Sequence, residues 1–93
     1  MIEIVGCLAF AIQGSDWRGE FKVNSSGLCI FTVINLRWSP PESPPYGWLC
    51  YAVDETSAES FDQIGVTKDS ATMRGKVSKG DIVMVECLPY ARP

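Results

Sequence analysis

Runs of apolar and β-branched residues separated by turn residues occupy most of the chain, and this pattern indicates a mainly β protein. Ile2 to Phe10 is rich in Ile, Val and Leu and is interrupted only by Gly6, so we expect a long first strand with a bulge or bend at this glycine. An extended pattern resumes at Glu20 to Val23 and ends at a strong turn signal, Asn24 to Gly27. Further strands are predicted over Leu28–Trp38, Trp48–Val53 and Ile82–Leu88.

One short helix is predicted, over Thr56 to Gly65. Phe61 and Ile64 are spaced i, i+3 within it, and a glycine stands at the position typical of a helix end. Val66 to Ser78 is predicted to be irregular. The resulting order of three strands, a helix and a further strand is typical of a small β-barrel of about five strands with one short helix.

The length of 93 residues predicts a single domain, residues 1–93, interrupted by a stiff proline-rich loop over residues 39–47. No apolar run approaches the ~20 residues that a membrane helix needs. No basic region precedes the first apolar run, as it would in a secretion signal. We therefore expect a cytoplasmic protein with no membrane contact.

The net charge of −3 argues against attraction of nucleic acid to the whole surface. Charge is nevertheless segregated along the second half of the chain. Residues 54–62 hold four acidic side chains and no basic one, whereas Lys68 to Lys79 holds four basic side chains and one acid. The basic segment is equally consistent with a solvated loop and with a local phosphate-binding patch.

The four cysteines lack CxxC spacing and the chain has no histidine, which argues against a zinc site. Each cysteine lies in an apolar run, so we expect buried reduced thiols rather than disulfides. Without histidine, the commonest general base is missing. The protein is therefore predicted not to be an enzyme and to need no cofactor and no small-molecule substrate. The cysteines are Cys7, Cys29, Cys50 and Cys87.

Several short motifs resemble those of one family. Val77 to Glu86 reproduces a hydrophobic-x-Lys-Gly-x-x-Val-x-Val-Glu pattern, and shorter matches cover Val5–Leu8, Phe21–Gly27, Phe31–Trp38 and Trp48–Val53. On these motifs the chain resembles the bacterial and phage single-stranded DNA-binding proteins of the OB-fold type. The resemblance implies an OB-fold-like barrel and sequence-independent binding of single-stranded DNA in replication, recombination or repair. It also implies a homo-oligomer, a dimer or tetramer, assembled through the first strand.

Binding of single strands requires aromatic rings that stack on bases and cations that contact phosphates. Alternation along the strands suggests that Phe31 and Val33 face the core, and that Trp48, Cys50 and Ala52 share the outer face. With this alternation, Leu49, Tyr51 and Val53 would face inward. The candidate DNA-binding residues are Trp17, Lys22, Arg37, Trp38, Tyr46, Trp48, Lys76 and Lys79.

An alternative stays open for both the site and the function. Trp38 and Trp48 lie at the two ends of the proline-rich loop, where they would pack against each other and hold its base. Asp54 stands where the family has an aromatic residue, and the sequence pI is about 4.7. These features favour an OB-fold protein-interaction module that has lost DNA binding.

Overall fold

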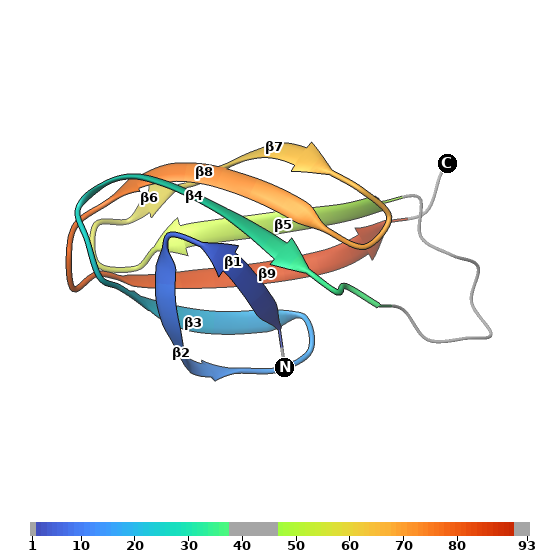
Figure 1. The fold of residues 1–93 in the computed structure, drawn as a ribbon, viewed down its shortest axis with the longest axis horizontal. Helices are drawn as coiled ribbons and strands as arrows, with labels where there is room; N and C mark the ends of the chain where they lie inside the picture. Colours follow the sequence, from blue (N-terminus) through green and yellow to red (C-terminus); the bar gives the residue numbers. More distant parts are fainter. Residues whose placement is uncertain (1, 38–46, 91–93) are drawn as a thin grey trace.

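The computed structural model describes residues 2–37 and 47–90, in which nine strands form two antiparallel sheets (Figure 1). The expectation of a mainly β protein is confirmed, but the sheets do not close into a barrel. The four-stranded sheet has the order β1 (Glu3–Gly6), β4 (Gly27–Ile34), β8 (Ala71–Val77) and β7 (Asp62–Val66). The five-stranded sheet has the order β2 (Leu8–Gly14), β3 (Arg18–Val23), β9 (Ile82–Tyr90), β5 (Gly47–Asp54) and β6 (Glu59–Ser60).

The hydrophobic core lies between the two sheets. In β4 the inward residues are Cys29, Phe31 and Val33, as the alternation predicts for the last two. Val83 and Val85 of β9 enter the same core from the other sheet. Because successive side chains of a strand point to opposite faces, each of these strands also presents a row of residues to the outside.

β1 and β2 form a V that spans the two sheets along one side. The chain reverses after Gly6, so that β1 pairs with β4 and β2 pairs with β3. A Cβ atom at Gly6 would lie 2.5 Å from the carbonyl oxygen of Ile30, and Gly6 has φ +136°. At the open end of the V, the backbone N–H of Ile2 donates to the carbonyl oxygen of Ser15 at 2.6 Å. The expected bend at Gly6 is therefore present, but the expected single long strand is wrong, because its two halves are separate strands in different sheets.

On the opposite side, a single strand passes from one sheet to the other at Phe61. Its first part, β6, pairs with β5, and its second part, β7, pairs with β8. The Phe61 ring packs on Gly75, where a Cβ atom would approach ring carbons to 2.7–2.9 Å, and it meets the Phe31 ring edge-on at 5.5 Å. These contacts fix the corner of the sandwich.

The predicted helix over Thr56 to Gly65 is wrong, since residues 55–58 form a turn that leads directly into β6 and β7. The Asp54 carboxylate accepts the backbone N–H groups of Thr56 and Ser57, and Ala58, with φ +62°, ends the turn. The irregular segment predicted over Val66 to Ser78 is also wrong, because it contains β8. Residues 2–37 and 47–90 contain no helix, and thus none long and apolar enough to cross a membrane.

The prediction of reduced cysteines is wrong as well, because all four form disulfides. Cys7–Cys29 ties the apex of the V to β4, and Cys50–Cys87 joins directly opposite residues of β5 and β9. The apolar runs that suggested isolated buried thiols are strands that pairing brings side by side. Spacing along the sequence does not reveal such pairing.

The inward and outward positions predicted for the side chains of β5 are the reverse of those observed. Trp48, Cys50 and Ala52 are buried in the core, whereas Leu49 and Tyr51 are exposed. The Cys50–Cys87 bridge requires Cys50 to face inward together with Cys87, and this sets the direction of every other residue of the strand.

Candidate binding surfaces

Aromatic residues of the predicted DNA site gather at one end of the sandwich. The Trp17 Nε1 donates to the carbonyl oxygen of Arg37 at 3.0 Å, and the Trp17 and Trp48 ring centroids are 6.2 Å apart. Trp38 and Tyr46, and nearly all of the predicted proline-rich loop, lie outside the described residues. At this end, the described part of the predicted site therefore consists of a tryptophan pair with one neighbouring arginine.

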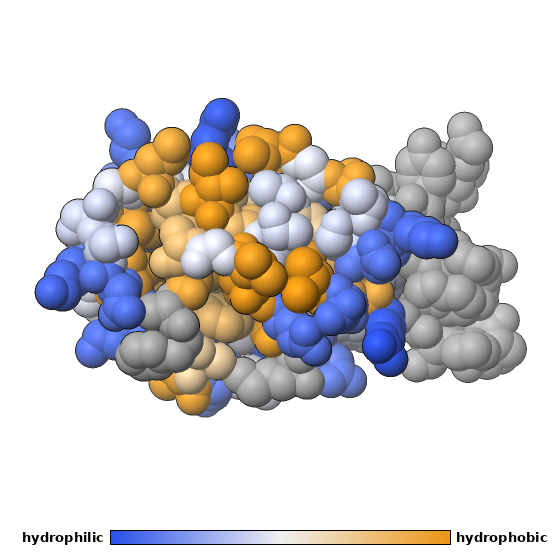
Figure 2. Space-filling model, viewed as in Figure 1, coloured by the Kyte–Doolittle hydropathy of each residue, from blue (hydrophilic) through white to orange (hydrophobic). Residues whose placement is uncertain are grey.

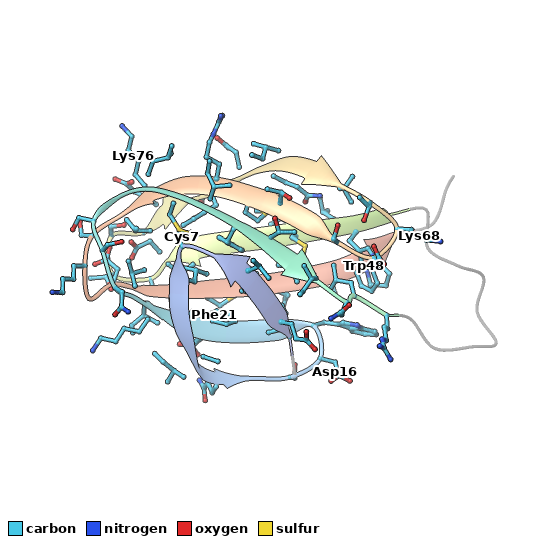
Figure 3. All side chains as sticks on the ribbon, in the orientation of Figure 1. Cys7, Asp16, Phe21, Trp48, Lys68 and Lys76 are labelled. Carbon is cyan, nitrogen blue, oxygen red and sulfur yellow. A yellow bond between two sulfur atoms is a disulfide. The ribbon has the colours of Figure 1, made fainter. Side chains whose placement is uncertain are left out.

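Trp48 is not available as a stacking platform, because its side chain is 0% exposed. Its Nε1 donates to the carbonyl oxygen of Lys68 at 2.8 Å, so the polar atom of the buried indole is satisfied (Figure 3). The prediction that Trp48 lies on the outer face is wrong, because the inward and outward positions predicted for β5 are the reverse of the observed ones. Trp17 is 38% exposed and is the more accessible member of the pair.

Cations of the predicted site lie at the other end of the molecule, which measures 41 Å along its longest axis. Lys22 is in register with Ile82 at the start of β9, whereas Trp48 is in register with Pro89 near its end, about 23 Å along the strand. Lys79 lies in the turn before β9, and Lys76 lies on β8 at the same end (Figure 3). The structure thus separates the predicted cations from the predicted rings, Arg37 excepted.

The outer face of the four-stranded sheet, here called the four-strand face, combines aliphatic and cationic side chains. Val5 is 58% exposed, Leu28 65% and Ile30 44%. In the β4–β8 register Leu28 stands opposite Lys76 and Ile30 opposite Arg74, so an aliphatic row and a cationic row run side by side. Figure 2 shows apolar side chains gathered over this sheet with charged ones around them.

The outer face of the five-stranded sheet, here called the five-strand face, has a different charge pattern. Leu49 and Leu88 stand opposite each other on β5 and β9, and Tyr51, 52% exposed, is in register with Glu86. Glu86 lies 4.0 Å from the Arg18 guanidinium on β3. This surface therefore carries apolar side chains among charges of both signs.

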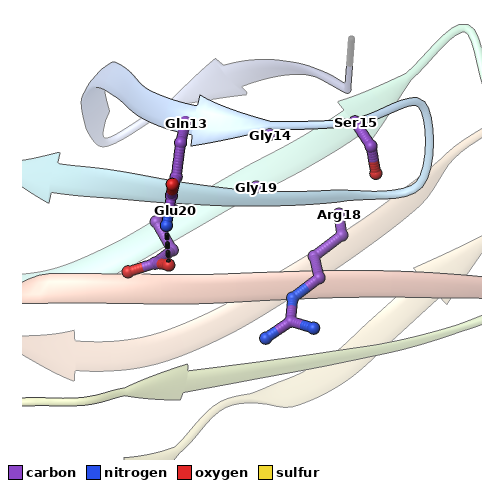
Figure 4. Close-up of a pocket in the computed structure, with 6 residues that line it drawn as sticks. All are labelled: Gln13, Gly14, Ser15, Arg18, Gly19 and Glu20. Atoms are coloured by element: carbon purple, nitrogen blue, oxygen red, sulfur yellow. Dashed lines mark hydrogen bonds between the residues drawn. The ribbon is translucent and has the colours of Figure 1, made fainter.

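A shallow hollow of about 300 Å³ opens on the β2–β3 hairpin of the five-strand face (Figure 4). Gln13 Nε2 donates to Glu20 Oε1 at 2.6 Å on one side of the hollow, and Arg18 forms the other side. Between them Gly14 stands opposite Gly19, whose inner side is filled by Ile2 and the Phe21 ring. Among the described residues, no group of three or more His, Cys, Asp or Glu side chains is placed to hold a metal ion.

Two aspartates share the buried end of the core near Lys79. Asp54 is fully buried and its Oδ2 has no hydrogen-bond partner within the described residues, while Asp81 accepts the backbone N–H of Ser78. The pKa of Asp54 is raised above its ordinary value of 3.8, first by burial and then by the neighbouring Asp81 carboxyl, against the lowering effect of two backbone N–H donors. Burial and the neighbouring carboxyl thus favour the protonated form of Asp54.

We expect the protein to be more stable near pH 4 than at pH 7. A carboxyl whose pKa is raised by folding contributes stability below its ordinary pKa, and this stability is lost as the pH rises through the folded-state value. The replacement Asp54→Asn keeps the acceptor for the turn and supplies an N–H toward Asp81, so it should flatten this dependence and raise stability at pH 7 by about 1 kcal/mol. Urea unfolding of both proteins at pH 4 and pH 7 measures the effect. An equal dependence of the unfolding free energy on pH in the two proteins would contradict the raised pKa of Asp54.

Comparison with family models, with curated proteins and with solved structures finds no match for this chain. Apart from the cations already named, the residues of the four-strand and five-strand faces were not predicted as a site. One signal was present, since Leu28 to Phe31 and Trp48 to Val53 are apolar at every position. Continuous apolar runs are typical of strands that are covered on both sides.

Proposed function

We propose that this protein is a non-catalytic binding module that docks a protein partner through the four-strand face. The observation that carries the proposal is the exposure of Val5, Leu28 and Ile30 beside two cations. Exposed apolar side chains that gather on one face mark interaction sites in soluble proteins. This corresponds to the interaction module that the sequence left open as an alternative.

The charges of the four-strand face favour a partner segment that mixes acidic and aliphatic residues. Neither Arg74 nor Lys76 forms an ion pair within the described residues, and the nearest acid in register is Asp62, opposite Arg74. Aliphatic residues of the partner would cover Leu28 and Ile30, and its carboxylates would pair with the row of cations. Complementary charge of this kind adds to specificity and to the rate of association.

Selection from a library of random peptides tests this proposal and requires no candidate partner. Enriched peptides should carry Asp or Glu among aliphatic residues, and Ile30→Ser or Arg74→Glu should weaken their binding about tenfold or more. Leu88→Ser is the matched control, since Leu88 is equally exposed on the opposite face. Peptides that bind Ile30→Ser and Arg74→Glu as tightly as the unchanged protein would overturn the proposal.

Single-stranded DNA binding by an OB-fold-like protein stays a prediction with its own test. Three lysines at one end, Lys22, Lys76 and Lys79, support a phosphate contact there, whereas Trp17 at the other end is the accessible ring. Titration with oligo(dT) at two salt concentrations, followed by tryptophan fluorescence, separates the two functions. Quenching of tryptophan fluorescence that weakens as the salt concentration rises would favour DNA binding. Unchanged fluorescence at low salt would exclude DNA binding by stacking of bases on tryptophan.

The two disulfides support a place of action in an oxidising compartment rather than the cytoplasm, because structural disulfides persist mainly where thiols are not kept reduced. Alkylation of the protein in intact cells, followed by mass measurement after denaturation, tests this point. Four alkylated cysteines would favour a reducing compartment, and none would favour an oxidising one.

A further inference from the structure

We infer that the five-strand face is the interface of a homodimer, in which Tyr51 of each copy lies against Arg18 of the other, beside the hollow. This surface is distinct from the four-strand face and is independent of the partner proposed for that face. It also differs from the interface that the family resemblance implies, which is formed by the first strand.

Charge identifies a second copy as the occupant. A two-fold interface brings the same patch of both subunits together, so its charges must complement themselves. The five-strand face carries Arg18 and Lys22 on β3 alongside Glu20 of the same strand and Glu86 of β9. On the four-strand face the neighbouring cations Arg74 and Lys76 of β8 have one acid in register, Asp62 opposite Arg74, so its centre is less balanced in charge.

The arrangement of strands supports the same assembly. β9 lies at the centre of the sheet, with β3 on one side and β5 on the other. A two-fold axis that lies in the interface and runs along β9 therefore places β5 of each copy over β3 of the other. This axis leaves the position of every residue along the strand direction unchanged, so residues at the same level of the two strands meet. It also brings the two Glu86 side chains of β9 together, each of them 4.0 Å from the Arg18 guanidinium of its own copy.

Tyr51 and Arg18 are at the same level, because both are in register with Glu86 of β9. The axis therefore brings Tyr51 of one copy onto Arg18 of the other. The hollow at the Gly14–Gly19 pair lies next to this arginine and is open at its surface (Figure 4). A tyrosine ring over a guanidinium is a favourable contact.

The same axis relieves a local excess of negative charge. The pKa of Glu55 is raised, first by partial desolvation and then by the Glu20 carboxyl, while Arg18 acts in the opposite direction. Glu55 lies at the level of Ile82, whose carbonyl oxygen accepts its backbone N–H, and Lys22 is in register with Ile82 on the other side of β9. The axis therefore brings the exposed Lys22 of one copy toward Glu55 of the other.

Sedimentation equilibrium of the disulfide-bonded protein over a range of concentrations tests the dimer. Tyr51→Ala should raise the dimer dissociation constant about 30-fold or more, the effect typical of a buried aromatic anchor. Leu28→Ala is the matched control on the four-strand face and should leave the constant unchanged. Both side chains are largely exposed in the monomer, so we expect both variants to fold, as urea unfolding will verify.

The inference is overturned if the unchanged protein is monomeric up to millimolar concentration, or if Tyr51→Ala dimerises as well as the unchanged protein. Loss of the dimer in Leu28→Ala alone would place the interface on the four-strand face instead. Peptide binding in the selection described above responds to Ile30→Ser and Arg74→Glu. Failure of the dimer and failure of the proposed function are therefore seen in different variants and different measurements.

Discussion

Replacement of the Cys50–Cys87 pair by Cys50→Ala/Cys87→Ala is expected to lower the free energy of unfolding by about 4 kcal/mol. The bridge closes a loop between residues 37 apart in the sequence, and its removal restores that conformational freedom to the unfolded chain. Urea unfolding of the oxidised protein and of the variant at one pH measures the difference. A change below about 1 kcal/mol would contradict a structural role for this disulfide.

The matched control is Cys7→Ala/Cys29→Ala, whose loop spans residues 22 apart in the sequence and whose expected loss is about 3 kcal/mol. A domain of this size has about 5–10 kcal/mol of stability in all. Loss of both disulfides should therefore leave the chain largely unfolded at body temperature. Full reduction of the unchanged protein in mild denaturant should have the same result, which circular dichroism will detect.

Trp48→Ala is expected to destabilise the protein by about 3–5 kcal/mol, because it removes a fully buried ring from the core. It also leaves the carbonyl oxygen of Lys68 without its indole donor. Thermal or urea unfolding measures the loss. Trp17→Ala, which removes the partly exposed member of the same pair, is the control and should cost much less.

Trp48→Phe distinguishes this structural role from base stacking. Phenylalanine keeps much of the buried aromatic surface and loses the hydrogen bond, so the variant should fold. Its affinity for oligo(dT), if the protein has one, should equal that of the unchanged protein. A large loss of affinity in folded Trp48→Phe would contradict the buried placement of this side chain.

Strands with clear alternation could be predicted from the sequence, and strands without it could not. In β4 the choice of Phe31 and Val33 as core residues is correct. Trp48 to Val53 is apolar at every position, so nothing local fixes which residues face inward. The choice of inward residues in β5 is set by Cys87, a residue far along the chain, through the disulfide with Cys50.

Two other errors have local explanations. Ala71 to Val77 does alternate, with Ala71, Met73 and Val77 buried, but Gly75 interrupts the pattern at the position where the Phe61 ring needs the space. Phe61 and Ile64 share a spacing of i, i+3, yet Phe61 is buried and Ile64 is exposed in an extended chain. A periodicity that rests on two residues is weak evidence for a helix.

The candidate surfaces depend on pairings between distant strands, which the sequence alone does not supply. Leu28 and Lys76 are neighbours only because β4 pairs with β8, and Arg18 meets Glu86 only because β3 pairs with β9. The predicted DNA-binding residues were instead chosen by type and by nearness in the sequence. The fold then placed Lys22 and Trp48 at opposite ends of the sandwich.

The side chain of Gln63 forms a substitute for a missing neighbour strand along β5. Its Oε1 accepts the backbone N–H of Cys50 and its Nε2 donates to the carbonyl oxygen of Trp48, both at 2.8 Å. An open strand edge is a template on which other chains polymerise, and here a single amide already occupies two of the backbone groups that would pair with them. Gln63 thus makes this part of the β5 edge a poorer template for the addition of a further strand.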